Sequence, residues 1–147
     1  MVPCTSGVVA AVTNGQGTIG YADAGQAGDL NAAYIKVGDD FTEPSADAAA
    51  KVLDASTQVE GRAATDIAID VDRKVADAGV YPVVLVSYQI VCQNYDDKAT
   101  ADLVKSWLEY VTSDEGQQAA AKDAGSAPLS AGIAGKVTKA VATIAAS

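Results

Sequence analysis

The sequence contains no histidine, and Arg62 and Arg73 are the only arginines among its 147 residues. Without histidine, the chain lacks the commonest general base and the commonest metal ligand of proteins. The net charge of −9 repels phosphate backbones, so nucleic acid is not expected as a partner. Aromatic residues make up only 5% of the chain, which favours helices packed tightly on sheets over an aromatic-rich barrel.

Long hydrophobic runs are also missing. The longest, from Val80 to Val86, has the length of a strand and not the roughly 20 residues of a membrane span. The start, Met1 to Pro3, has neither the basic nor the apolar region of a secretory signal. Two alternatives stay open: the protein is cytoplasmic, or its signal lies outside this chain. The length suits one globular domain with a core of its own.

There are two cysteines, Cys4 and Cys92. They are either buried thiols or a disulfide, because cysteines far apart in sequence pair only where the fold brings them together. Export from the cell would favour the disulfide.

Three glycines, Gly15, Gly17 and Gly20, have the spacing G-x-G-x-x-G. In a dinucleotide-binding loop such glycines follow a strand and open a helix. Here the order is reversed: the pattern predicts a helix over 7–13 before the glycines and a short strand, TIGYA, over 18–22 after them. We therefore interpret the glycines as a helix stop and a turn.

The rest of the chain alternates between strand and helix patterns, which predicts an α/β fold. A nearly continuous run of β-branched and aromatic residues predicts a long, central, buried strand over 80–92, entered through Pro82. Trp107 has helical core spacing and is expected in the core. The other expected strands are 32–37 and 67–71, and 57–65 is expected to be a loop. The expected helices run from Ser45 to about 55, from Asp97 or Thr100 to 111, over 114–124 up to Gly125, and from Ser130 with Ile133, Val137, Val141 and Ile144 inward.

Few residues suggest chemistry. Asp70 and Asp72 would share one strand face, but a hard-cation site needs more oxygen ligands, so a solvated face is the favoured interpretation. A nucleophilic serine would need a base, and no S-x-x-K motif of that type is present. We predict no catalytic residue, no metal and no cofactor.

Five motifs become informative together: GVVAAV, GTIGYAD, EPS before an Ala-rich helix, YPVVLVSYQIV, and SDEGQQAAAKDAGSAPLS. In this order and spacing, from Ser6 to Ile144, the chain resembles the C-terminal part of the substrate-binding protein of the phosphate ABC transporter. The details resemble the versions from high-GC Gram-positive bacteria.

The resemblance implies a two-lobe α/β architecture of the periplasmic-binding-protein type II kind, of which this chain is the C-terminal portion. Residues 1–80 would belong to the second lobe and residues 89–147 to the first. Residues 81–88 would cross between the lobes, with Tyr81, Pro82 and Val83 as hinge candidates. The parent protein is expected outside the cytoplasm, at the cell surface or in the periplasm.

The resemblance also implies a function: capture of inorganic phosphate and its delivery to the membrane subunits of an ABC importer. The family's phosphate ligands lie upstream and include an arginine followed by Ser-Gly-Thr, and Thr5-Ser6-Gly7 is not that motif. Neither Arg62 nor Arg73 stands where the family's arginine does, so no ligand residue is carried over. The chain alone is expected not to bind phosphate without an N-terminal segment.

Two other hypotheses stay open. The second hypothesis is that the chain is a self-associating, non-binding module that buries its edges as a homo-oligomer or with a complementing fragment. The third hypothesis, an enzyme acting on phosphate esters, is disfavoured by the missing histidine.

Overall fold

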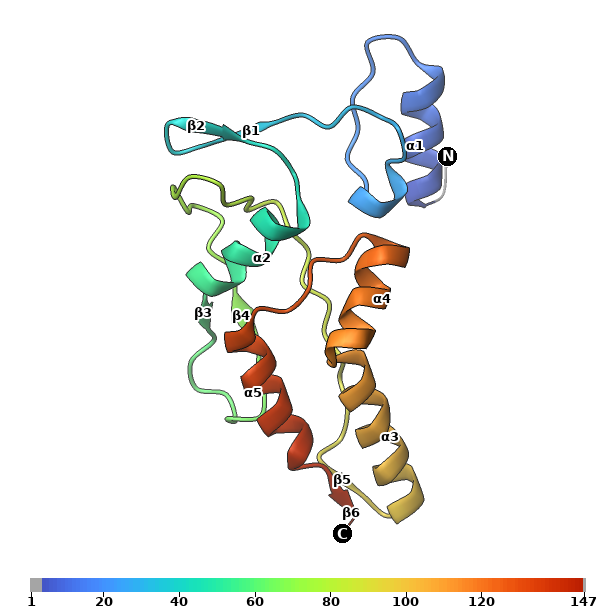
Figure 1. Ribbon diagram of the computed structural model, residues 1–147, viewed down its shortest axis with the longest axis vertical. Helices are drawn as coiled ribbons and strands as arrows, with labels where there is room; N and C mark the ends of the chain where they lie inside the picture. Colours follow the sequence, from blue (N-terminus) through green and yellow to red (C-terminus); the bar gives the residue numbers. More distant parts are fainter. Residues whose placement is uncertain (1–3, 147) are drawn as a thin grey trace.

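The computed structural model describes residues 4–146 (Figure 1). Met1 to Pro3, on which the expectation about a signal sequence rests, lie outside the described residues, as does Ser147. In chain order the elements are α1 (Thr5–Asn14), η1 (Ala24–Gln26), β1 (Ile35–Val37), β2 (Asp40–Thr42), α2 (Ala46–Ala55), β3 (Thr57–Gln58), β4 (Ile69–Asp70), β5 (Asn94–Tyr95), α3 (Lys98–Val111), α4 (Asp114–Ala124), α5 (Ala131–Ala142) and β6 (Ala145–Ala146).

The strands form three separate two-stranded ladders. β1 and β2 make an antiparallel hairpin in which Lys36 pairs with Phe41, and the turn contains Gly38 at a φ of 61°. β3 pairs antiparallel with β4. β5 pairs parallel with β6, so the last described residues lie beside the start of α3. The chain is therefore α/β, but its sheets are small.

The helices α2 to α5 each begin at a capping residue. Its side chain accepts a hydrogen bond from the backbone N–H three residues later, which satisfies a donor that the helix itself cannot. At α1 the N-cap is Cys4, and its side chain makes no capping hydrogen bond. Of the two alternatives for α3, the cap is Asp97, whose Oδ2 lies 2.8 Å from the Thr100 nitrogen. α4 ends at Gly125, at a left-handed φ of 66°. The other caps are Ser45, Ser113 and Ser130.

Two apolar clusters lie in different parts of the molecule. The first lies beside α2, with Val52 fully buried. The second joins α3 to α5 and β5, as the pattern of the last helix predicts. The first cluster contains Val52, Val75 and Val80 packed with Leu53, Val71 and Val84; the second contains Leu108, Val141 and Ile144 packed with Tyr95, Val104 and Val137.

The glycine motif is a helix stop and a turn, as predicted. Gly15 is the C-cap of α1 and Gly17 has a φ of 67°. A Cβ on Gly20 would lie 2.9 Å from Val8 Cγ1, so this glycine lets the returning chain lie against α1. The predicted strand over 18–22 is wrong: residues 18–22 form no strand, and Tyr21 is 95% exposed.

The long central strand predicted over 80–92 is also wrong. Val80 is buried, but residues 80–92 form no strand, and Figure 1 shows them as a long trace between β4 and β5. Leu85 and Ile90 are 91% and 94% exposed. The physical reason is that a strand needs a second strand to pair with, and none lies beside this segment within residues 4–146.

Smaller corrections concern two other strands, a loop and Trp107. Of the strand expected over 32–37 only Ile35–Val37 pairs, and of that over 67–71 only Ile69–Asp70. The loop expected over 57–65 begins with β3. Trp107, expected in the core, is 56% exposed, because α3 packs through its other face, which contains Leu108.

Candidate functional site

The hinge candidates Tyr81, Pro82 and Val83 directly follow Val80, the last buried residue of the first apolar cluster. The Tyr81 N–H donates to the Ala48 carbonyl of α2 at 3.0 Å. The Arg73 guanidinium donates through Nη1 to the Pro82 carbonyl at 3.0 Å and through Nη2 to the Val84 carbonyl at 3.1 Å. Three hydrogen bonds therefore join residues 81–84 to the part of the chain that precedes them.

The Arg73 contacts also show how this segment is oriented. Carbonyls two residues apart point to the same edge of an extended chain, and the planar guanidinium fork spans both. The exposure agrees with an extended chain, because Val84 packs on the first cluster while Val83 and Leu85 on either side are exposed. Arg73 therefore occupies, at its beginning, one edge of the segment over residues 83–91, called here the open segment.

The open segment is fastened again in its middle by a side chain. The Tyr88 hydroxyl accepts a hydrogen bond from the Ile69 N–H of β4 at 2.9 Å. Within residues 4–146, no backbone–backbone hydrogen bond engages the open segment. The Val84 carbonyl, which accepts from Arg73, is the backbone group of the open segment that a side chain engages.

Both arginines already have partners within the described residues. Arg62 donates to Asp66 in an exposed ion pair, with 2.6 Å from Nη2 to Oδ2. The hydrogen bond that Arg62 donates to Asp66, and then the negative charge of Asp66, raise the pKa of Arg62. Arg73 is committed to the two carbonyls described above. An oxyanion would find no uncommitted guanidinium within residues 4–146.

The helix N-termini at Ser130 and at Thr5-Ser6 are further candidate places for an anion, because backbone N–H groups point outward at a helix start. At α5, the Ser130 hydroxyl donates to the Asp54 carboxylate at 2.5 Å, so a negative charge already lies beside this terminus. At α1, Cys4 is the N-cap and its side chain makes no capping hydrogen bond. Neither terminus gathers the cationic side chains of an anion site.

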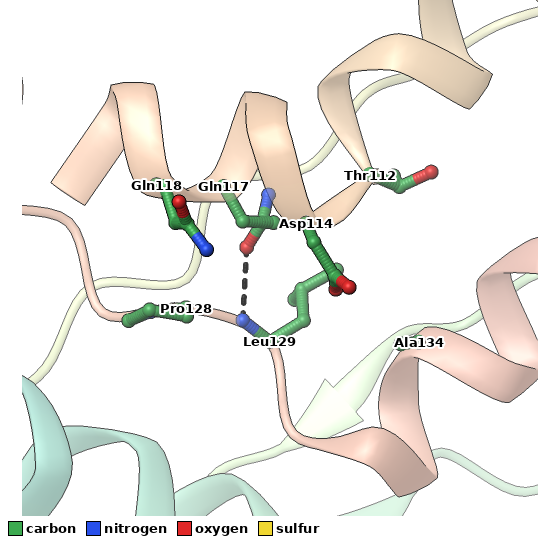
Figure 2. A pocket seen from close by; sticks show the side chains of 7 residues that line it. All are labelled: Thr112, Asp114, Gln117, Gln118, Pro128, Leu129 and Ala134. Atoms are coloured by element: carbon green, nitrogen blue, oxygen red, sulfur yellow. Dashed lines mark hydrogen bonds between the residues drawn. The ribbon is translucent and has the colours of Figure 1, made fainter.

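Two shallow hollows lie on the surface of the described chain. One, of about 200 Å³, lies between the start of α4 and the chain entering α5 (Figure 2). There the Gln117 Oε1 accepts from the Leu129 N–H at 2.9 Å, and Asp114 adds a carboxylate to the wall. The other, of about 300 Å³, is lined by β3 and its neighbours and includes Glu60 and Asp70. Both hollows have carboxylates and no cationic side chain among their lining residues.

The acidic pair Asp70 and Asp72 does not make a metal site with a third ligand. Within the described chain, no group of three or more acidic residues or cysteines is placed to hold a metal ion. Asp72 instead accepts from the Lys74 N–H at 2.9 Å, closing a local turn.

Cys4 and Cys92 are both exposed free thiols, so the alternative of two buried thiols is wrong. They adjoin α1 and β5, which lie at opposite ends of the long axis of the molecule (Figure 1). A disulfide needs Cα atoms within about 7 Å of each other. Their pairing stays a prediction, and this arrangement does not bring the two thiols together.

Comparison with protein-family models assigns the chain to a family. The family model described as the PBP superfamily domain matches residues 1–115, most of the chain, and the chain belongs to this family. Its fold is a partial α/β periplasmic-binding-protein fold, and its role is of the periplasmic-binding type. No curated protein and no solved structure matches the chain. None of the described helices is both long and apolar enough to span a membrane.

Proposed function

We propose that this chain is the C-terminal portion of the substrate-binding protein of a phosphate ABC importer. In this role it captures inorganic phosphate outside the cytoplasm and delivers it to the importer's membrane subunits. It does so only together with an N-terminal segment that supplies the phosphate ligands. The family match supports the binding role, and the five ordered motifs of the sequence support phosphate as the ligand.

The observation that carries the proposal is the commitment of both arginines. A dry oxyanion site needs charge-assisted donors, above all a guanidinium fork. Arg62 is paired with Asp66, and Arg73 donates hydrogen bonds to two backbone carbonyls. The carboxylates in both hollows and at the start of α5 also disfavour an anion at those places. Together these observations support ligands supplied by another segment.

The arrangement of the core also supports the proposed division of the chain. The first apolar cluster lies before residue 81 apart from Val84, and the second lies entirely after residue 89. Residues 81–88 connect them and carry the three hinge candidates, so we assign this stretch as the crossing between lobes. The two parts also contact each other directly, through the hydrogen bond from Ser130 to Asp54.

The test is a calorimetric titration of phosphate into the chain alone and into the chain refolded with an N-terminal segment from a close relative. We expect no binding heat from the chain alone and tight, stoichiometric binding after complementation. A parallel titration with sulfate tests whether phosphate is preferred. Tight binding by the chain alone would overturn the proposal, as would the absence of binding by a complex shown to have formed.

Two variants make this test sharper. Arg62→Gln and Arg73→Gln each remove one guanidinium from this chain. Because the proposed ligands lie on the N-terminal segment, Arg62→Gln should leave the phosphate Kd of the complemented protein unchanged. A large loss of affinity in Arg62→Gln, with complex formation intact, would place a ligand in this chain after all.

A further inference from the structure

We propose that the open segment, residues 83–91, is a self-complementary docking edge along which two copies of this chain pair as antiparallel strands. The pairing is two-fold symmetric, so each copy presents the same residues to the other. The inference concerns the chain itself and does not depend on phosphate or on the complementing segment.

The first argument is the state of the backbone. Within residues 4–146 the open segment makes no backbone–backbone hydrogen bond, and Arg73 covers one edge only at the Pro82 and Val84 carbonyls. Residues alternate between the two edges of an extended chain, so Leu85, Ser87 and Gln89 present their N–H and C=O groups at the opposite edge. An edge of this kind is a template for another strand.

The second argument is the distribution of charge. A chain with a net charge of −9 repels its own copy over most of its surface. The stretch from Tyr81 to Tyr95 contains no charged residue, so antiparallel pairing of the open segment sets no like charges opposite each other. Its side chains are also those that favour strands, with Leu85 and Ile90 more than nine-tenths exposed.

The third argument is the area available. The accessible surface of the chain is 10266 Å², whereas a compact protein of this mass exposes about 7,000 Å². The excess, spread over the whole chain, is larger than the roughly 800 Å² that each partner contributes to a standard stable interface. A second copy is the partner that this self-complementary, uncharged edge fits.

The experiment is sedimentation equilibrium of the purified chain over a range of concentrations, without phosphate and with a reducing agent present. The reductant prevents Cys4 and Cys92 from linking copies covalently. We expect a reversible monomer–dimer equilibrium that added salt strengthens, because salt screens the repulsion between the two acidic chains. A chain that stays monomeric at every concentration would overturn the proposal.

Two pairs of variants locate the interface. Leu85→Lys should raise the dimer Kd by about tenfold or more, whereas Ile19→Lys, at a site that is 88% exposed but distant in sequence, should leave it unchanged. Ser87→Pro removes a backbone donor from the open edge and should weaken the dimer, while Ser87→Ala keeps the donor and should not. Circular dichroism verifies that each variant keeps its helices.

The outcomes separate this proposal from its rivals. A dimer that survives Ser87→Pro unchanged would exclude strand pairing, and equal loss in Ile19→Lys and Leu85→Lys would indicate unspecific association. Either result would overturn the proposed edge. Both leave the phosphate titrations untouched, so failure here is distinguishable from failure of the proposed function.

Discussion

Two apolar regions of this chain differ in how far their side chains are buried. The helical region of α3, α4 and α5 buries Leu108, Val141 and Ile144 in a cluster that also fixes β5 and β6. The open segment is equally apolar, yet Leu85 and Ile90 are almost fully exposed. The first region is built from helices, whose backbone groups are satisfied within each helix. The second can be satisfied only by another strand.

This difference explains why the helical region is packed by its own contacts while the open segment stays exposed. A helix needs only something to pack on, and α3 and α5 supply that to each other. A strand needs a neighbour at its edge as well as cover for its faces, so its order depends on a second segment. The predictions that follow test whether the two regions differ in this way.

The largest effect is expected at the centre of the helical cluster. Leu108 is 5% exposed and packs with Val141 and Ile144. Leu108→Ala should lower the free energy of unfolding by about 2–5 kcal/mol, through lost burial and the cavity left behind. Urea unfolding followed by circular dichroism measures the loss. A loss below about 1 kcal/mol would show that this cluster does not form the stable core.

The close approach of α4 to the end of α3 gives the next largest effect. A Cβ on Gly116 would lie 2.1 Å from the Tyr110 carbonyl oxygen, so Gly116→Ala must shift backbone and should cost about 1–3 kcal/mol. Gly135, within α5, is the matched control because nothing lies within 4 Å of its added Cβ. Gly135→Ala should instead stabilise the chain by up to about 1 kcal/mol. Equal unfolding midpoints for the two variants would contradict this packing.

The same contrast decides what the sequence alone could predict. Local signals are sufficient for the caps at Ser45 and Ser130, for the stop at Gly125, and for the inward face of α5, because each depends on residues a few positions away. The family resemblance, drawn from the order of motifs, agrees with the family match at the level of a periplasmic-binding-type protein.

What the sequence could not predict depends on segments far away or outside the chain. The apolar run over 80–92 shows that the segment has faces to bury, but no local pattern says whether a second strand lies beside it. Trp107 has core spacing, yet the buried side of α3 contains Ala101 and Leu108 and leaves Trp107 exposed. The role of Arg73 was also missed, because its partners are backbone carbonyls, which leave no trace in sequence.

The junction between the two regions should respond more weakly. Arg73→Gln removes the fork that holds the Pro82 and Val84 carbonyls, at a cost of about 0.5–1.5 kcal/mol, since exposed hydrogen bonds contribute little. The amide of Tyr81, which donates to Ala48, should then exchange its hydrogen faster. Lys74→Gln removes the neighbouring charge without touching these carbonyls and serves as the control. Unchanged exchange at Tyr81 would mean that Arg73 does not fasten the crossing.

A smaller, pH-dependent effect is expected at the start of α3. The Thr100 hydroxyl, and then the Thr100 and Ala99 N–H groups, lower the pKa of Asp97 below its ordinary value of 3.8. Because the folded pKa is the lower one, the charged cap stabilises the chain above about pH 3.8, and this contribution is lost as the pH falls through the folded pKa. Asp97→Asn keeps a capping oxygen but does not titrate. Its urea midpoint should therefore fall less steeply than that of the unmodified chain below pH 3.8; parallel curves would contradict the shift.

The smallest effect is expected for Leu85→Ala, which makes the same change in the open segment as Leu108→Ala makes in the helical cluster. Leu85 is 91% exposed where Leu108 is 5% exposed, so Leu85→Ala removes the same atoms with almost no loss of burial. At concentrations where the chain is monomeric, the free energy of unfolding should change by no more than about 0.5 kcal/mol. At concentrations where copies pair, the same variant should lose stability relative to the unmodified chain, because association adds to the stability of the folded state by mass action. If Leu85→Ala were as costly as Leu108→Ala in the monomer, the open segment would be packed within the chain, and neither a second copy nor a complementing segment would be needed to cover it.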